Sequence, residues 1–408
     1  MTQIDRTFYK LYNHFGPQNW WPAQSDIEMM LGAILVQNTS WKNVENVLSQ
    51  FEHFDGQTLC EMPFDTLAKL IQASGSYKRK TQSILELMNW YQEYDFNPDN
   101  LSNIDTLTLR KSLLNIHGIG EETCDCILLY AFNRPVFVVD VYLRRLLDKL
   151  SYPKLKSYSS IQKLMMDTLP HDVPLFQEYH ALIVEYGKKY LPKSPVHYED
   201  DPLNTFEDNV EYTLKDLAAI PNQETIRFWI ANYGFVERAS YPDPFWGSVH
   251  TIIGQLISAA AARTIYKRFQ ETFPSLESVQ NSTADDIKKV GLPRTKSQYI
   301  FDLAQSIKNQ FIDFQQIYDM NDDEAIHTLT QIKGFGVWSA KILLIHSFNR
   351  LDISSYEDIG LRNGLKKHLS IPEIDKEMFD SYLETFVPYK TIASIYLWKI
   401  NHSSSDKR

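Results

Sequence analysis

The sequence predicts an all-α protein made of two tandem domains, and three observations carry this prediction. Apolar residues recur at spacings of three and four through most of the 408-residue chain, as amphipathic helices require. The alternation of apolar and polar residues that indicates strands is rare. The second half of the chain repeats motifs of the first at a nearly constant offset. A chain of this length with 43% hydrophobic residues can bury two cores, of roughly 200 residues each.

Helical spacing is clearest in four segments. In chain order these are IEMMLGAILV from Ile27, LAKLIQAS from Leu67, IFDLAQSIK from Ile300 and MFDSYLETFV from Met378. Each places its apolar residues on one face of a helix. The short apolar run RPVFVVD, 134–140, lies between helical segments, and we expect it to be a connection.

The domain boundary is predicted from a loss of helical periodicity. Residues 190–208 contain three prolines and an acidic cluster, and the turn signals are strongest there. We therefore expect an N-terminal domain over 1–195, a linker and lead-in over 196–234, and a C-terminal domain over 235–408.

Four anchors define the repeat. Over the whole alignment their offset varies by only two residues, which chance does not readily produce, so one ancestral domain occurs twice. The pairs are Gln37 with Gln255 (218 apart), Gly75 with Gly291 (216), the hairpin Gly118-Ile119-Gly120 with Gly334-Phe335-Gly336 (216), and Asp140 with Asp358 (218).

Charge and composition limit the function classes. The net charge is −10, and neither half is basic: residues 1–204 carry 19 Lys+Arg against 25 Asp+Glu, and the rest 22 against 26. Any contact with DNA must therefore be local, through backbone N–H groups and a few lysines. The chain has no apolar run of about 18 residues and no apolar export signal, so we expect a cytoplasmic protein without a membrane partner. The three cysteines, Cys60, Cys124 and Cys126, are too few for a disulfide framework or a four-cysteine metal site.

The repeated hairpin points to phosphate binding. In LLNIHGIGEETCDCILLY and in LTQIKGFGVWSAKILLI, a helix ends, glycines occupy alternate positions, and a new helix begins. The free N–H groups and the dipole of that new helix suit a phosphate. A single such turn would more often be a glycine helix cap, and Asp140 or Asp358 alone would more often be a helix N-cap. The duplication of both features favours function.

These motifs resemble those of the helix-hairpin-helix DNA glycosylases of the endonuclease III superfamily. The resemblance covers roughly 1–195 and 235–402. The first block is similar to the 3-methyladenine glycosylase branch that lacks an iron–sulfur cluster, at NWWPAQSDIEMMLGAILVQNTSWKNVENVL, HGIGEETCDCIL and VVDVY. The second resembles bacterial 3-methyladenine DNA glycosylase II, at IIGQLISAAAA, GLPRTKSQYIFDLA, IKGFGVWSAKILL, YEDIGL and FVPYKTIASIYLW.

The resemblance implies two tandem helix-hairpin-helix glycosylase domains that act on alkylated bases in double-stranded DNA. It implies base flipping, no iron–sulfur cluster and no other cofactor, although a monovalent cation at the hairpins is compatible with it. We expect a monomer associated with the bacterial nucleoid. Lyase members have a lysine where this chain has Glu122, and a carboxylate forms no imine, so we expect base release without strand cleavage.

The resemblance also assigns roles to residues. The catalytic carboxylates are Asp140 and Asp358, with Glu357 as an alternative to the latter. Gln37 would fill the gap left by the flipped base in the first domain, and Gln255 or Leu256 in the second. The hairpins would bind DNA through Gly118, Ile119, Gly120 and Thr123, and through Gly334, Phe335, Gly336 and Ser339; the base would stack on Trp20, Trp21 or Trp41, and on Trp338 or Tyr356.

Two alternatives stay open at this point. The substrate could be uracil, a mispaired thymine or an oxidised base, because aromatic pocket residues do not name the base. The chain could also be a DNA-binding protein with an inactive domain, although an aspartate in both copies disfavours this.

Overall fold

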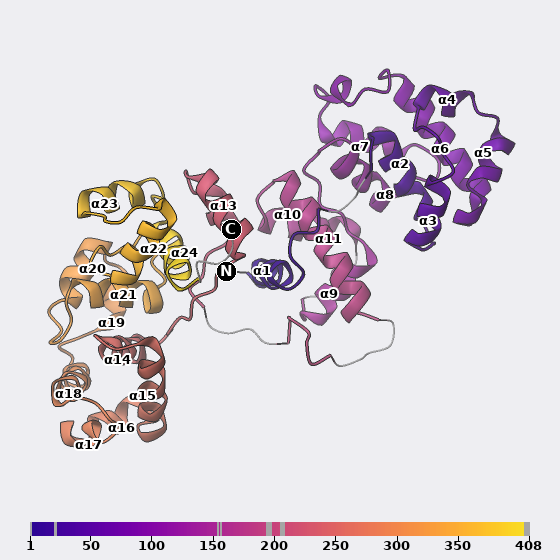
Figure 1. Ribbon diagram of the computed structural model, residues 1–408. Helices are drawn as coiled ribbons and strands as arrows, with labels where there is room; N and C mark the ends of the chain where they lie inside the picture. Colours follow the sequence, from indigo (N-terminus) through magenta and orange to yellow (C-terminus); the bar gives the residue numbers. More distant parts are fainter. Residues whose placement is uncertain are drawn as a thin grey trace. The chain divides into compact units, whose positions relative to one another are not determined.

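The computed structural model describes residues 2–19, 23–152, 155, 157–192, 198–204 and 209–403, and it confirms the all-α prediction (Figure 1). Within these ranges the one pairing of extended backbone is an isolated antiparallel bridge between Asn209 and Ala239. The chain forms two compact units, Thr2–Asn204 and Thr205–Arg408. No helix in the described part of the chain is long and apolar enough to cross a membrane.

The first unit has two groups of helices (Figure 1). The larger group buries a core around Met30, Ile34, Leu87 and Met88. It comprises α2 (Asp26–Leu35), α3 (Trp41–Leu48), α4 (Gly56–Glu61), α5 (Phe64–Leu70), the 3₁₀-helix η1 (Gln72–Ser74), α6 (Tyr77–Gln92), the 3₁₀-helix η2 (Pro98–Leu101), α7 (Thr106–Leu114), α8 (Glu121–Cys126) and the π-helix η3 (Ile127–Ala131). The smaller group comprises α1 (Gln3–Phe15), α9 (Val141–Lys149), α10 (Tyr158–Thr168) and α11 (Val173–Tyr190).

The connection between the two groups is the extended run 134–140, as the sequence predicts. Its side chains from Val136 to Val139 are buried, so the run threads through the core and brings Asp140 to the start of α9.

The second unit repeats this plan. Figure 1 shows α14–α18 on one side of the unit and α20–α24 on the other. The helices are α12 (Leu214–Ala219), α13 (Gln223–Tyr233), α14 (Pro244–Gly254), α15 (Ala259–Thr272), α16 (Leu276–Gln280), α17 (Ala284–Lys288), α18 (Arg294–Lys308), α19 (Phe314–Ile317), α20 (Asp322–Leu329), α21 (Val337–Phe348), α22 (Ile359–Leu369), α23 (Lys376–Glu384) and α24 (Lys390–His402).

Part of the segment that precedes Phe235 is a packed element of the second unit. Trp229 of α13 is fully buried, and its ring lies 5.4 Å from that of Phe386 and 5.5 Å from that of Tyr396, centroid to centroid. The lead-in therefore contributes a large aromatic side chain to the core of this unit.

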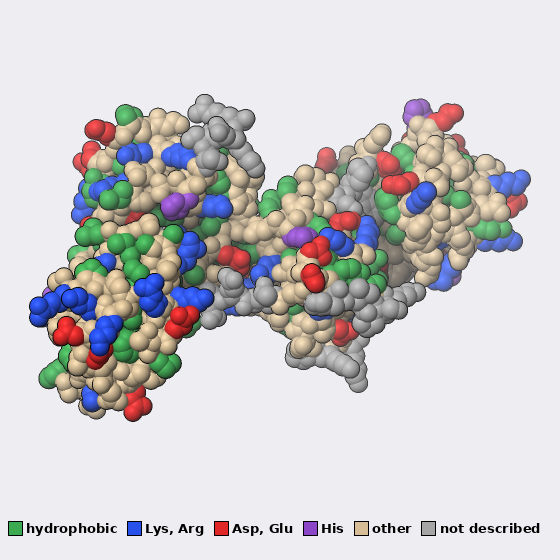
Figure 2. Space-filling view, turned by 60° about the horizontal axis from the view of Figure 1, so that its bottom comes forward, with side chains coloured by type: hydrophobic (Ala, Val, Ile, Leu, Met, Phe, Trp, Pro, Cys, Tyr) green, Lys and Arg blue, Asp and Glu red, His purple; other side chains and the backbone are tan. Residues whose placement is uncertain are grey.

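The surface carries both signs of charge. In the view of Figure 2, lysine and arginine side chains lie beside aspartates and glutamates on both units. This distribution agrees with the nearly equal counts of basic and acidic residues in the sequence.

Candidate active sites

The glycine hairpins pack tightly against a neighbouring helix. Gly118 has φ +80° and Gly334 φ +91°, in the left-handed region that favours glycine. A Cβ atom on Gly118 would lie 2.1 Å from Ser83 Oγ, and one on Gly334 would lie 2.3 Å from the Tyr299 ring. The second glycine of each hairpin differs, because a Cβ there would meet nothing within 4 Å. Each hairpin thus has one face locked to the protein and one open face.

The middle residue of each hairpin belongs to the core. Ile119 is 5% exposed and Phe335 6%. The open face is therefore made by the backbone at Gly120 and Gly336, where α8 and α21 begin.

A glutamine side chain joins each hairpin to the turn that follows α2 or α14. Gln37 Nε2 donates to Gly118 O at 3.1 Å and to Thr123 Oγ1 at 2.9 Å. Gln255 Nε2 makes the same two bonds in the second unit, to Gly334 O at 2.9 Å and to Ser339 Oγ at 3.1 Å. The Thr123 and Ser339 hydroxyls are buried and face these amides.

This arrangement bears on two groups of predicted residues. Thr123 and Ser339 are placed to shape the hairpin, since their hydroxyls face inward. The carbonyl oxygens of Gly118 and Gly334 already accept from the glutamine amides.

The residue after each glutamine projects from the protein. Leu256 has φ +59° and is fully exposed, and Asn38 has φ +54° and is exposed at the matching turn. A fully exposed leucine in a left-handed conformation is unusual. Of the two predicted wedge residues, Leu256 thus points into open space, while Gln255 is tied to the hairpin.

A buried lysine supports each of these turns. Lys80 Nζ donates to Leu35 O at 2.8 Å and to Ser74 O at 2.7 Å, and its side chain is 2% exposed. Lys296, 216 positions later, donates to Ile253 O at 2.9 Å and to Gln255 O at 2.6 Å. Burial lowers the pKa of both lysines. The two ammonium groups satisfy the carbonyls at the C-terminal ends of α2 and α14.

Asp140 caps α9 and is 6% exposed. Its Oδ1 accepts from the Leu143 N–H at 2.7 Å, and its Oδ2 lies 3.9 Å from His180 Nε2. Burial raises the pKa of Asp140 to about 7, and the Glu122 carboxylate adds to the rise, whereas backbone N–H donors oppose it. The carboxyl group therefore gains a proton near neutral pH.

The surroundings of Asp140 come from three helices. His180 of α11 is buried, and burial lowers its pKa to about 4, so the ring is neutral at pH 7. Its Nδ1 lies 2.8 Å from the Tyr130 hydroxyl. When Tyr130 donates to Nδ1, the ring carries its proton on Nε2, facing Asp140. Glu122 is the second residue of α8. Part of its side chain reaches the surface, but desolvation of its carboxyl group by the surrounding protein raises its pKa, and Arg144 opposes the rise.

Asp358 caps α22 but is held differently. Its Oδ1 accepts from the Leu361 N–H at 2.9 Å and from Trp398 Nε1 at 3.1 Å. Its Oδ2 accepts from Trp338 Nε1 at 2.9 Å. Both oxygens of this carboxylate thus have neutral N–H donors.

The two aspartates have matching neighbours of different chemistry. Trp338 lies 216 positions after Glu122, and Trp398 lies 218 after His180. A carboxylate and an imidazole in the first unit therefore correspond to two indoles in the second.

Glu357, the predicted alternative to Asp358, faces elsewhere. It accepts from Ser355 Oγ at 2.7 Å and lies 3.7 Å from Lys341 Nζ. The geometry favours Asp358 as the carboxylate of the second site.

With this geometry established, the comparisons with known proteins decide the family. Residues 31–171 and 249–388 each match the HhH-GPD superfamily of base excision DNA repair proteins. The chain belongs to this family. Both HhH-GPD copies contain the hairpin and the aspartate, and the activity class is that of a DNA glycosylase.

The similar proteins each match a part of this chain that is about as long as one of its two domains. A protein of Methanocaldococcus jannaschii named as a DNA repair glycosylase is 40% identical over 195 residues, which is 45% of this chain and 89% of that protein. The DNA-3-methyladenine glycosylase of Saccharomyces cerevisiae is 29% identical over 203 residues, 40% of this chain and 69% of that one. The structure of the H. pylori 3-methyladenine DNA glycosylase bound to 1,N6-ethenoadenine aligns with 25% identity and a TM-score of 0.41, covering 47% of this chain and all of that chain.

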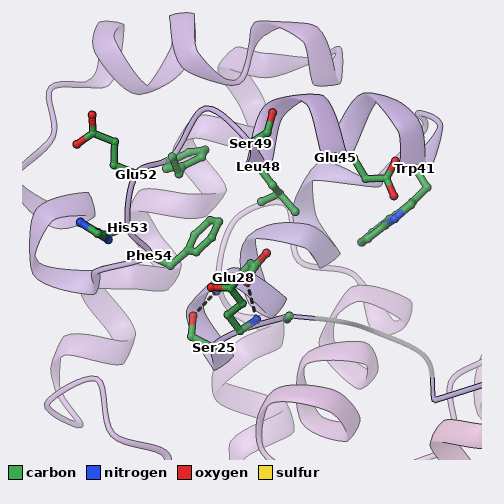
Figure 3. A pocket seen from close by; sticks show the side chains of 12 residues that line it. Ser25, Glu28, Trp41, Glu45, Leu48, Ser49, Glu52, His53 and Phe54 are labelled. Atoms are coloured by element: carbon green, nitrogen blue, oxygen red, sulfur yellow. Dashed lines mark hydrogen bonds between the residues drawn. The ribbon is translucent and has the colours of Figure 1, made fainter.

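The first HhH-GPD unit has two clefts that adjoin each other. One, of about 650 Å³, lies between α2, α3 and the following loop, and Trp41, Phe51 and Phe54 line it together with Glu28 and Glu45 (Figure 3). The other, of about 340 Å³, shares Ala23, Gln24 and Ser25 with the first and extends to Tyr130.

The predicted base-pocket residues fall into three classes. Trp41 lines the larger cleft, although Asp140 does not, and Trp338 touches Asp358 directly. Tyr356 faces α23, because its hydroxyl donates to Ile374 O at 3.3 Å and its ring lies 5.7 Å from that of Phe379. Trp20 and Trp21 lie outside the described residues.

The sequence patterns did not point to several residues of the sites. His180 and Trp398 lie on the last long helix of each unit, about 40 residues after the aspartate, and no local motif marks them. Lys80 and Lys296 lie within aligned segments of the repeat, and their shared position was the one available signal.

We predict that Lys80→Met destabilises the first unit by about 2–4 kcal/mol, because the Leu35 and Ser74 carbonyls lose a charged donor while buried. Urea unfolding of the full chain measures this. Lys78→Met is the matched control, since Lys78 is exposed on the same helix. Equal midpoints for the two variants would contradict the capping role.

Proposed function

We propose that both units remove alkylated bases of the 3-methyladenine type from double-stranded DNA by hydrolysing the N-glycosidic bond. The observation that carries the proposal is that each of the two family copies contains a glycine hairpin and an aspartate that caps a helix. Relatives named as 3-methyladenine glycosylases support the substrate class.

Access to the bond requires base flipping, because a duplex stacks the base and hides the sugar carbon. The hairpins would hold the backbone through the N–H groups at Gly120 and Gly336, which suit phosphates without a large positive charge. Leu256 and Asn38 project at the matching turns, so we place the wedge in the second unit on Leu256. Gln37 and Gln255 would support these turns from the hairpin side.

The aspartate then acts on the sugar. As the base leaves, positive charge develops on the sugar ring, and an ionised carboxylate beside it stabilises that charge. The same carboxylate can accept a proton from the attacking water. The water oxygen joins the sugar carbon, the base leaves with the bond's electron pair, and an abasic site remains. Asp140 and Asp358 take this role.

Alkylated purines suit the first site by charge. Methylation at N3 or N7 of a purine nucleoside leaves a positive charge on the base. Glu122 and Asp140 are both carboxyl groups of this site, and a cation between them favours their ionised forms. Aromatic rings such as Trp41 would add a cation–π attraction of about 0.5–2 kcal/mol.

The reaction would stop at base release. Strand cleavage by a lyase needs an amine that forms an imine with the sugar. The lyase position holds Glu122 in the first unit, and its counterpart in the second is Trp338. Neither side chain is a primary amine.

We predict that Asp140→Asn and Asp358→Asn each remove the release of bases at their own site, and that the double variant loses it at least about 100-fold. Asparagine still accepts the helix N-cap bonds to Leu143 and Leu361, so the fold is retained. Release of 3-methyladenine from methylated DNA measures this. A double variant as fast as the wild type would refute the role of the aspartates, and release of uracil alone would refute the alkylated-base assignment.

We predict a pH dependence for the first site, measured in the Asp358→Asn background. Because the pKa of Asp140 in the free protein is raised to about 7, its ionised form is lost as pH falls through 7. The value of kcat/KM for base release, which reports the free enzyme, should therefore drop about tenfold from pH 8 to pH 6. Glu122→Gln removes a neighbouring charge and should move the midpoint to lower pH. Glu121→Gln is the matched control, and an unmoved or higher midpoint in Glu122→Gln would contradict this electrostatic account.

We predict that borohydride traps no covalent complex between the wild-type chain and DNA, and that strands with abasic products stay intact. Electrophoresis on denaturing gels measures both. Glu122→Lys provides the comparison, because it introduces an amine at the lyase position and should become trapped. A trapped wild-type complex would show that another amine attacks the sugar.

A further inference from the structure

The Arg238 guanidinium has no partner for its donors. It is half-buried, and within the described part of the chain no group accepts a hydrogen bond or forms a salt bridge with it. Its Cζ lies 4.2 Å from the centroid of the Trp398 ring. The guanidinium stacks on an indole while its five N–H donors have no acceptor among the described residues, so they are available to a ligand that carries acceptor oxygens.

Arg238 lies at the second site. Trp398, on which it stacks, donates to Asp358, and the Asp358 carboxylate attracts the guanidinium. Three titratable groups that interact with it are neutral near pH 7. Burial lowers the pKa of His250 to about 4 and that of His346 to about 3, and Arg238 lowers both further; burial raises the pKa of Tyr241.

The first unit has a different residue in this register. Arg238 lies 218 positions after Trp20, the same offset as between the two aspartates. The first unit also carries Glu122 where the second carries Trp338. The first site thus has an additional carboxyl group, that of Glu122, and the second an additional guanidinium, that of Arg238. These groups of opposite charge favour different bases.

We infer that Arg238 is a specificity residue of the second site and binds the carbonyl oxygen of flipped 6-oxopurines, such as hypoxanthine. This inference rests on the proposed function. A guanidinium donates in parallel to O6 and N7 of a 6-oxopurine, whereas a 6-aminopurine presents an amino donor to it. Its positive charge also repels a cationic base. Besides alkylated bases, the second site therefore also accepts neutral bases that carry this carbonyl, whereas the first site favours cationic ones.

The oxygen that Arg238 binds could also come from a DNA phosphate. We assign it to the base because the guanidinium lies against the indole that holds the catalytic carboxylate. The two sources differ in their consequences. Loss of a phosphate contact weakens binding to every duplex alike and reduces its salt dependence, whereas loss of a base contact changes selectivity.

The test uses bases that differ in two properties, the charge of the base and the presence of the carbonyl group. Four bases supply the combinations: hypoxanthine (neutral, carbonyl), 3-methylguanine (cationic, carbonyl), 1,N6-ethenoadenine (neutral, none) and 3-methyladenine (cationic, none). The Asp140→Asn background confines release to the second site. We expect Arg238→Met to lower kcat/KM for hypoxanthine by about tenfold or more and to leave that for 1,N6-ethenoadenine within about threefold. Both cationic bases lose the same charge repulsion, so the ratio of kcat/KM for 3-methylguanine to that for 3-methyladenine should fall about tenfold. Arg227→Met, an exposed arginine on α13, is the matched control.

Two results would overturn the inference. One is an equal loss for all four bases, which indicates a phosphate contact or a folding defect, and the other is no change for hypoxanthine. Arg238→Lys keeps the positive charge but loses the two parallel N–H donors. It should lower the preference for carbonyl bases by a smaller factor than Arg238→Met does. If the second site releases no base at all, the proposed function fails there. The affinity of the Asp140→Asn/Asp358→Asn protein for hypoxanthine against ethenoadenine duplexes, with and without Arg238→Met, then still decides the role of Arg238.

Discussion

The glutamine amide that joins each hairpin to the turn after α2 or α14 is the contact on which the sites depend. It connects backbone about 80 residues apart in sequence, through Gln37 and Gly118 in one unit and Gln255 and Gly334 in the other. The turn that carries the projecting residue is thereby joined to the hairpin. The lysines beneath the turns reinforce it, because Lys296 also binds the Gln255 carbonyl. These few polar groups fix the positions of both parts of the proposed DNA contact.

The sequence predicted the helical fold, the duplication and the pairing of hairpin with aspartate, because these features are local or repeat at a fixed offset. Helical spacing and alternate glycines leave a signal within a few residues, and Asp140 and Asp358 follow runs whose ends are visible. The family match over both copies confirms the assignment to the helix-hairpin-helix glycosylases.

The remainder of each site was beyond the reach of local patterns. Trp398 meets Asp358 only because α24 packs along α22, and His180 reaches Asp140 through the equivalent packing of α11 on α9. Such contacts depend on tertiary geometry, and a tryptophan or histidine in a long apolar helix looks like core. The sequence likewise did not show that the Gln255 side chain turns toward the hairpin and that its neighbour Leu256 is the residue that projects. Tyr356, a predicted base-pocket residue, lies two positions before Asp358 in the sequence, but its side chain packs on α23.

The two aspartates show how one fold position can serve different electrostatics. A carboxylate that stabilises a cationic sugar must be ionised, but burial opposes ionisation. In the second unit two indole N–H groups and a backbone N–H stabilise the ionised carboxylate without adding charge. In the first unit the second oxygen lies 3.9 Å from His180 Nε2. Burial raises the pKa of Asp140 to about 7, and the Glu122 carboxylate adds to the rise. By linkage, a positive charge bound there must lower that pKa and ionise the group. Under the proposed mechanism, a cationic base therefore helps to ionise the carboxylate that acts on its sugar, whereas a neutral base does not. The N–H donors around Asp358 do not depend on the charge of the base, and this difference would give a duplicated enzyme a physical reason to keep both sites.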